Sequence, residues 1–502
     1  MRMLRSMFSF GGASIAMAAM TLGACGSDDT IVPIVSDAGK DATAADAAVD
    51  APSSDAAADA KDDADVPRGE AGAPGRPSLS ALGHVVVIYL ENHSFDNLYG
   101  SYPGAEGLAA SQVGIPQIDS STNQPYATLP QTDPHIPDGK LANQPFDLTP
   151  YVPEDQKTVD VQHRYYQEQT QIHGGKMDRF VDINYSKGLA LGYYPTASLP
   201  MVKFAQSIGG KVTVCDHFFH AAFGGSFLNH MWLIAARTPE FFDAPDFMKS
   251  QLDAQGNVKP DADRALTPDG YAINTIYSVN QPHPTIDDTK TRYLPNQTFP
   301  TIGDQLTAAG VDWAWYAGGW NDALAGTIDP TLQYQYHHQP FIYFANYADG
   351  TEAKARHLKD ESDFVAAAKA GTLPPVSFVK PVGINNEHPQ YATMVAGQQH
   401  TIELIQAIMG GPAWKDTAIV ITYDENGGFW DHVPPPTRDK WGPGVRVPTL
   451  VISPFATSGI DATPYDTTAI LKLIEKRWGL PSLNAAVDGQ ADLASHALRF
   501  AL

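Results

Sequence analysis

Six continuous apolar runs constrain the fold of this 502-residue chain more than any other feature of its sequence. None of them alternates between polar and apolar residues, so each is typical of a strand that is buried on both faces of a parallel sheet. The runs are HVVVIYL (84–90), VTVCDHFF (212–219), VDWAWYA (311–317), PVSFVKP (375–381), TAIVITYD (417–424) and VPTLVISP (447–454). Helical patterns lie between some of them, such as GQQHTIELIQAIMGG before the run at 417. This alternation predicts an α/β fold, a three-layer sandwich with a mostly parallel central sheet.

Two long stretches interrupt this pattern, at residues 105–160 and 240–300, and both are rich in Pro, Asp and Asn. We expect long loop insertions or lids there rather than a separate domain.

The first 25 residues are typical of an export signal. Arg2 and Arg5 precede an apolar run, Met7 to Leu22, that is short for a membrane span. The run ends in LGAC, which is similar to the bacterial lipoprotein cleavage box, so residues 1–25 are predicted to end at a lipidated Cys25. Ordinary signal cleavage beside an incidental cysteine is the alternative. We therefore expect an exported protein, either lipid-anchored to the bacterial cell envelope or periplasmic or secreted.

Residues 26–78 are predicted to be a disordered tether, which would hold a catalytic or binding domain, residues 79–502, off a membrane. Residues 41–65 hold eleven Ala and eight Asp and have no aromatic side chain, so they cannot bury enough apolar surface to offset the entropy of ordering. The formal charge of −23 argues against nucleic acid as a partner, because phosphate binding requires clustered Lys and Arg. Cys215, inside an apolar run, is expected to be a small buried side chain.

Polar side chains follow the apolar runs directly. Glu91 and Asn92 follow the first run, and Asp424 and Glu425 stand at the end of the fifth. Sites in open α/β sheets form outside the carboxyl ends of the strands. Several carboxylates brought together there cannot all ionise without a cation, and carboxylate and amide oxygens suit a divalent metal. A helix cap or a surface turn is the alternative for each pair. Further candidates at strand ends are Asp216, His217, His220, Glu387, His388, Asp431 and His432.

A nucleophile is present in AAFGGSFLNHMWLIAA, where Ser226 follows two glycines and precedes a helical run. The N-terminus of such a helix favours an anion such as phosphate. A neighbouring metal can lower the pKa of the hydroxyl and make it a nucleophile. Taken alone, a serine in such a GGS motif is more often a helix N-cap.

The sixteen histidines include several in polar contexts, namely His135, His163, His173, His337, His338, His388 and His432. Each one singly fits a structural or surface role. Together they can hold phosphoryl oxygens and protonate a leaving alkoxide.

The quoted motifs resemble those of the bacterial phosphoesterase family that contains phospholipases C and acid phosphatase A and is related in fold to alkaline phosphatase. The resemblance spans about residues 82–485. It rests on VVVIYLENHSFDNLYGSYPG (85–104), DVQHRYYQEQTQIHGGKMDRF (160–180), NNEHP (385–389), ITYDENGGFWDHVPPP (421–436), GPGVRVPTLVISPF (442–455) and YDTTAILKLIEKRWGLPSL (465–483).

The resemblance implies a role for each matching position. Glu91 with Asn92 and Asp424 with Glu425 match the two metal-binding pairs. Ser226 matches the nucleophile, which is also a metal ligand. His163, His338 and His388 match the histidines around the phosphoryl group, with His337 beside His338 and His135 competing for the role of His163. Around Ser226 the chain reads GGSFLNHMW, so it lacks the proline and arginine of many phospholipase members but keeps Asn229.

The resemblance implies an exported, metal-dependent phosphoesterase that hydrolyses phosphomonoesters or phospholipid phosphodiesters through a phosphoseryl intermediate. One divalent metal ion is expected, and Mg, Ca, Mn, Zn and Fe all remain open. A phosphate ester or a phospholipid is the expected substrate, and the membrane is a partner through the lipid anchor. The alternatives are a catalytically inactive surface lipoprotein that binds a polyanion or glycan, and a sulfatase-like ester hydrolase on the same fold.

Overall fold

The computed structural model describes residues 75–111, 115–284 and 293–501. The central sheet contains β1 (His84–Leu90), β6 (Val212–Cys215), β8 (Trp313–Ala317), β9 (Leu358–Asp360), β10 (Val376–Lys380), β11 (Thr417–Tyr423), β12 (Thr449–Ile452) and β13 (Gly459–Asp461). Short paired strands are β2 (Ile118–Asp119), β3 (Gln124–Pro125), β4 (Phe146–Asp147), β5 (Gly192–Tyr193), β7 (Phe218–Phe219) and β14 (Tyr465–Asp466). The α-helices are α1 (Phe95–Tyr99), α2 (Leu108–Ser111), α3 (Tyr165–Ile172), α4 (Pro200–Ser207), α5 (Ser226–Ala235), α6 (Ile302–Ala308), α7 (Trp320–Ala325), α8 (Glu352–His357), α9 (Glu361–Ala370), α10 (Met394–Met409), α11 (Thr468–Trp478) and α12 (Ala485–Asp488).

The central sheet has eight strands in the order β13-β6-β12-β11-β1-β10-β8-β9. Every pairing in it is parallel except the two that β12 makes with β11 and β6. Strands β8, β10 and β11 are buried along their whole length, as expected for strands covered on both faces. The predicted α/β fold with a mostly parallel sheet is confirmed.

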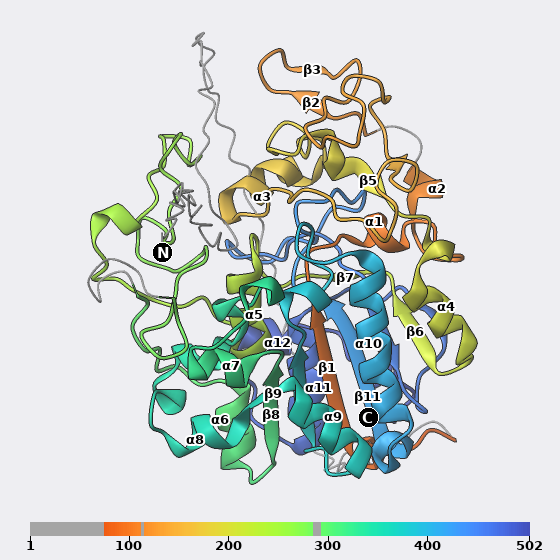
Figure 1. The fold of residues 1–502 in the computed structure, drawn as a ribbon, viewed down its shortest axis with the longest axis vertical. Helices are drawn as coiled ribbons and strands as arrows, with labels where there is room; N and C mark the ends of the chain where they lie inside the picture. The colour runs from red at the N-terminus through yellow and green to blue at the C-terminus, as the bar shows by residue number, and fades with distance from the viewer. Residues whose placement is uncertain (1–74, 112–114, 285–292, 502) are drawn as a thin grey trace, which may run out of the picture.

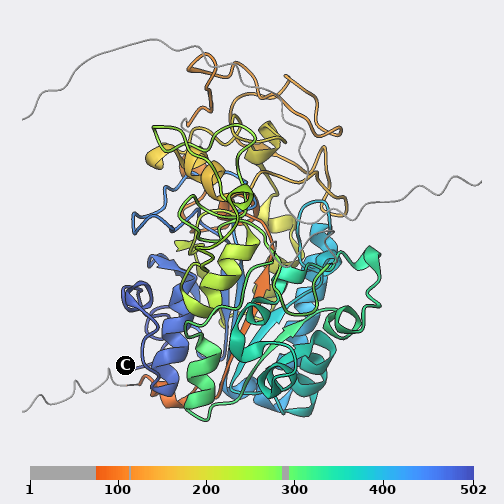
Figure 2. The same ribbon diagram turned by 90° about the vertical axis from the view of Figure 1, so that its left-hand side faces the viewer.

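Helices cover both faces of this sheet, so the fold has three layers, with the sheet between two layers of helices (Figures 1 and 2). Helices α9 and α10 pack together on one side, where α4 also contacts α10. On the other side α11 packs against α5 and α12. The longest helix, α10, begins at the N-cap Thr393, whose side chain accepts a hydrogen bond from the Ala396 amide.

Two of the predicted strands differ from their sequence patterns. The run at 212–219 is divided between β6 in the central sheet and β7, which pairs with β14 in a separate two-stranded sheet. The polar pair Asp216–His217 lies between the two strands and ends the first of them. The run at 447–454 forms β12, which is antiparallel rather than parallel. A continuous apolar run reports burial on both faces and carries no information on strand direction, so the prediction for β12 was wrong for that reason.

The interrupting stretches form irregular segments with few regular elements, as expected for insertions. Those near the N-terminus, orange to yellow in Figure 1, lie over one end of the central sheet. The predicted signal peptide (1–25) and most of the predicted tether (26–78) lie outside the described residues, so the division of the chain at these positions stays a prediction. Cys215 is buried, as expected. Within the described ranges, none of the helices has both the length and the apolar character needed to cross a membrane.

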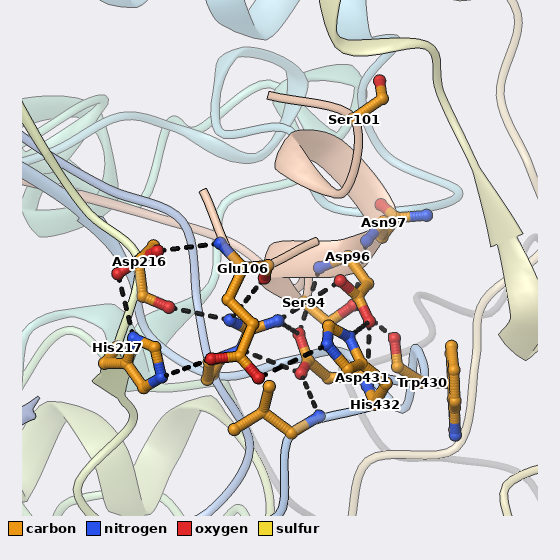
Figure 3. Close-up of polar contacts among 12 residues, drawn as sticks. Ser94, Asp96, Asn97, Ser101, Glu106, Asp216, His217, Trp430, Asp431 and His432 are labelled. Carbon is orange, nitrogen blue, oxygen red and sulfur yellow. Dashed lines mark hydrogen bonds and ion pairs between the residues drawn. The ribbon is translucent and has the colours of Figure 1, made fainter. Parts of the chain in front are cut away.

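A buried arginine joins the loops that follow β1 and β11. The Arg446 guanidinium is fully buried and pairs with Asp431 (Nε to Oδ1, 2.9 Å) and with Asp96 (Nη2 to Oδ1, 3.2 Å). It also donates to the carbonyl oxygens of Glu106 and Asp216. Figure 3 shows the surrounding chain of acids and histidines, in which His432 pairs with Asp96. Because Asp96 lies in α1 and Asp431 follows β11, Arg446 fixes the two loops relative to each other.

Replacing Arg446 with methionine should lower the free energy of unfolding by about 3–5 kcal/mol, because it leaves two buried carboxylates without their cation. Denaturant unfolding of both proteins measures the difference. The control is Arg356→Met, which removes an ion pair to Asp312 whose side chains are 60% and 57% exposed, and it should cost about 1 kcal/mol or less. Equal losses for the two variants would contradict this role of Arg446.

Candidate functional site

Two adjacent strands, β1 and β11, bring the predicted acidic pairs to one edge of the sheet. Strand β1 lies between β11 and β10, and Leu90 is in register with Tyr423. Glu91 and Asp424 therefore follow neighbouring strand ends. The backbone amide of Asn92 donates to Asp424 Oδ1 at 3.3 Å, which joins the two loops directly. Glu91, Asn92, Asp424 and Glu425 are all fully buried, so none of them lies in a surface turn.

The local backbone explains how these two loops approach so closely. Asn92 has a φ of 63°, in the left-handed region that asparagine tolerates better than most residues. Opposite it, Gly427 also has a positive φ of 63°, and a Cβ at this position would lie 2.3 Å from the Asn92 carbonyl oxygen. Gly427, the first glycine of DENGG, is thus required by the contact between the two acidic loops.

Ser226 is the first residue of α5, and Gly225 is its N-cap. The serine is therefore not the N-cap, and its hydroxyl donates to Glu91 Oε2 at 3.2 Å. The structure therefore places Ser226 beside the predicted metal ligands, at the positive end of a helix dipole. Asn229 holds the preceding turn, because its side-chain amide donates to the carbonyl oxygens of Ala222 and Gly224.

The pKa values of the three buried acids, Glu91, Asp424 and Glu425, are shifted in different directions. Burial, together with the nearby charge of Glu91, raises the pKa of Asp424 to about 8. Burial and the charge of Asp424 raise the pKa of Glu425 well above its usual range. Burial alone would also raise the pKa of Glu91, but His338 and Lys380 offset it and hold that pKa well below its usual range. Without a further cation, the three carboxylates cannot all be ionised.

The donor atoms here fit a divalent cation. Asn92 Oδ1 and Glu425 Oε1 are buried and accept no hydrogen bond within the described part of the chain. Such oxygens are costly to bury unpaired and are the ligands that hard divalent cations prefer. Ligand atoms of Glu91, His230 and His338 also lie within 4.8 Å of one another, and imidazole nitrogens suit zinc or iron.

The predicted histidines fall into two groups at this edge. His338 Nε2 lies 2.8 Å from Glu91 Oε1, and its ring stacks on that of His230 at 4.9 Å. His163 Nε2 lies 3.4 Å from the side-chain nitrogen of Asn92, and its ring meets that of His388 edge-on at 5.7 Å. Burial lowers the pKa of His338 to about 4 and also lowers the pKa of His388.

Three other histidine candidates, His135, His220 and His432, pair with acids away from Glu91 and Asp424. His135 is half-exposed and pairs with Asp133, whereas His163 contacts Asn92. His220 forms a buried pair with Glu168, and His432 pairs with Asp96. His337 is buried beside His338 without a hydrogen-bond partner in the described ranges. The acids Asp96 and Asp431 surround Arg446, which already neutralises them, so we assign no cation to that group.

Two residues at the site were missed by the sequence analysis. Lys380, at the end of β10, forms an ion pair with Glu91 Oε1. His230 lies one helical turn after Ser226 and donates through Nδ1 to the Ser226 carbonyl oxygen at 2.7 Å. The signal for Lys380 was a single charge at the end of an apolar strand, and the signal for His230 was its i+4 spacing from Ser226.

Comparisons with known proteins give the family. The model of the Phosphoesterase family matches residues 82–481. Phospholipase C B of Mycobacterium tuberculosis is 26% identical over 455 residues, which cover 83% of this chain and 76% of that protein. Non-hemolytic phospholipase C of Pseudomonas aeruginosa is 22% identical over 446 residues, or 81% of this chain and 55% of that protein.

Among solved structures, a protein of the alkaline phosphatase superfamily from Vibrio parahaemolyticus aligns with a TM-score of 0.32 and 9% identity, covering 68% of this chain and 73% of that one. A TM-score this low adds nothing to the assignment. The family match, by contrast, contains all the predicted site residues and both acidic loops. This chain belongs to the Phosphoesterase family.

Proposed function

We propose that this protein is an exported, metal-dependent phosphoesterase that transfers the phosphoryl group of its substrate to Ser226. One observation carries the proposal: the Ser226 hydroxyl donates to Glu91 at the start of α5, beside the buried acids of a second loop. A serine held there has its hydroxyl directed at an acidic cluster rather than at its own helix. Membership of the Phosphoesterase family supports the same reaction class.

The cation is proposed to be held by Glu91, Asn92, Ser226, Asp424 and Glu425. A divalent ion bound there would lower the pKa of the serine hydroxyl and offset the charge on the phosphoryl oxygens. The unpaired buried oxygens of Asn92 and Glu425 are the features that fit it.

In the first step, the Ser226 oxygen forms a bond to phosphorus while its proton leaves through the Glu91 carboxylate. The bond from phosphorus to the substrate alcohol breaks, and His388 or His338 gives a proton to the departing oxygen. His163, next to Asn92, is placed to contact a phosphoryl oxygen. In the second step, water attacks the phosphoserine, phosphate or a phosphorylated headgroup leaves, and Ser226 regains its proton.

The substrate is proposed to be a phosphomonoester or a phospholipid, because the relatives named above are phospholipases C. Export, and anchoring through a lipidated Cys25, are proposed from the sequence of residues 1–25 alone. A lipid anchor would keep the domain near a membrane, which suits a phospholipid substrate.

Replacing Ser226 with alanine should reduce turnover at least about a hundredfold, since covalent catalysis through the hydroxyl is lost. The assay compares phosphate released from p-nitrophenyl phosphate with phosphocholine released from phosphatidylcholine. The control is Ser207→Ala, the same change at an exposed position at the end of α4. Full activity of Ser226→Ala contradicts the mechanism, and preferential cleavage of a sulfate ester by the unaltered enzyme favours the sulfatase-like alternative.

Metal affinity should fall at least about tenfold for each pH unit below 8, since the cation must displace the proton from Asp424, whose pKa is raised to about 8, and from Glu425, whose pKa is also raised. A raised pKa favours folding of the metal-free protein at low pH, and that contribution disappears as the pH rises through 8. The stabilisation that a cation adds should therefore increase between pH 6 and 9.

Isothermal titration of metal-free protein with Mn²⁺ at pH 6, 7, 8 and 9 measures the affinity, and thermal unfolding at each pH measures the stabilisation. Asp424→Asn should weaken metal binding and flatten both pH dependences. A pH-independent affinity in the unaltered protein would show that Asp424 does not contact the cation.

A further inference from the structure

Lys380 is the last residue of β10, and its side chain is 1% exposed. The ammonium forms an ion pair with Glu91 Oε1 and lies 5.3 Å from the centre of the Tyr89 ring. Burying a charge this deeply costs free energy unless a strong partner offsets it, so a buried lysine at a site calls for an explanation. No step of the proposed reaction uses it.

A count of charges around the site gives Lys380 a role. Glu91, Asp424 and Glu425 contribute three negative charges when all are ionised, and each is fully buried. In the described residues their ion pairs come from Lys380, His338 and His230. Lys380 is the one lysine or arginine among these partners, and its charge offsets one of the three negative charges. The remaining balance is two negative charges, which is the charge of one divalent cation.

The position of Lys380 also explains the orientation of Glu91. Lys380 and His338 both contact Oε1 of Glu91, whereas the Ser226 hydroxyl contacts Oε2. One carboxylate oxygen is thereby occupied by the protein's own cation. The other oxygen faces the nucleophile and is the one available to a metal ion.

We propose that Lys380 acts as a built-in monovalent cation of the site: its charge beside Glu91 Oε1 limits the site to a single divalent ion, bound on the Oε2 side. The proposal rests on the proposed function, because it assumes that these carboxylates bind a metal. A purely structural lysine and a charge-setting lysine predict opposite effects on metal binding. Loss of a structural lysine misplaces Glu91 and weakens binding, whereas loss of a repelling charge strengthens it.

The test is the Lys380→Met variant of the full chain, titrated with Mn²⁺ at pH 8.5, with the bound metal counted by inductively coupled plasma mass spectrometry. The unaltered protein should bind one ion. The variant should bind that ion about tenfold more tightly or take up a second one, because a like charge next to the ligand has been removed. Lys380→Arg should retain one ion with the original affinity.

The matched control is Lys354→Met, which removes another buried lysine, paired with Asp349 away from the site. It should leave metal stoichiometry and affinity unchanged. If Lys380→Met does not fold, Lys380→Gln removes the charge and keeps a hydrogen-bond donor for Glu91. Unchanged or weaker Mn²⁺ binding in the folded variant, or two ions in the unaltered protein, overturns the proposal. The metal count does not depend on which ester is cleaved, so a failure of the proposed reaction would appear separately, as full activity of Ser226→Ala.

Discussion

The burial of three carboxylates at the ends of adjacent strands is the constraint on which the rest of this site depends. Glu91, Asp424 and Glu425 lie where β1 and β11 end side by side, out of contact with solvent. Like charges at such short range in a low-dielectric interior repel one another strongly. Burial, with this repulsion added to it, raises the pKa of Asp424 and that of Glu425, whereas the pKa of Glu91 is lowered because His338 and Lys380 face it. The proposed cation would offset this repulsion, and it would then link folding, pH and metal binding in one site.

The surrounding structure holds that unfavourable arrangement in place. Arg446 joins the loops after β1 and β11 through Asp96 and Asp431. Gly427 allows the second loop to approach the Asn92 backbone. The start of α5 then brings Ser226 against Glu91. Each contact joins segments far apart in the sequence, and the parallel sheet places all of them at one edge.

Much of this arrangement was predictable from sequence, because it depends on local patterns. Continuous apolar runs identified β1, β8, β10 and β11, and the polar residues after them identified the acidic loops. The direction of β12 was not predictable, since burial on both faces is compatible with either pairing. The division of residues 212–219 into β6 and β7 depends on which neighbours each half meets. Lys380 and His230 were missed because an isolated Lys or His gains meaning only from the atoms around it, which here come from other strands and helices.

The roles given to Ser226 and to the acids share one requirement, that a single cation lies between the two loops. Anomalous diffraction from crystals grown with Mn²⁺ tests it most directly. The account predicts one anomalous peak within coordination distance of carboxylate oxygens from both Glu91 and Asp424, with the Ser226 oxygen beside it. Ligand atoms of Asp160, His163 and His388 also lie within 4.8 Å of one another and form a second group that could hold a metal ion. No peak between the two loops, or a peak confined to this second group, would contradict the account.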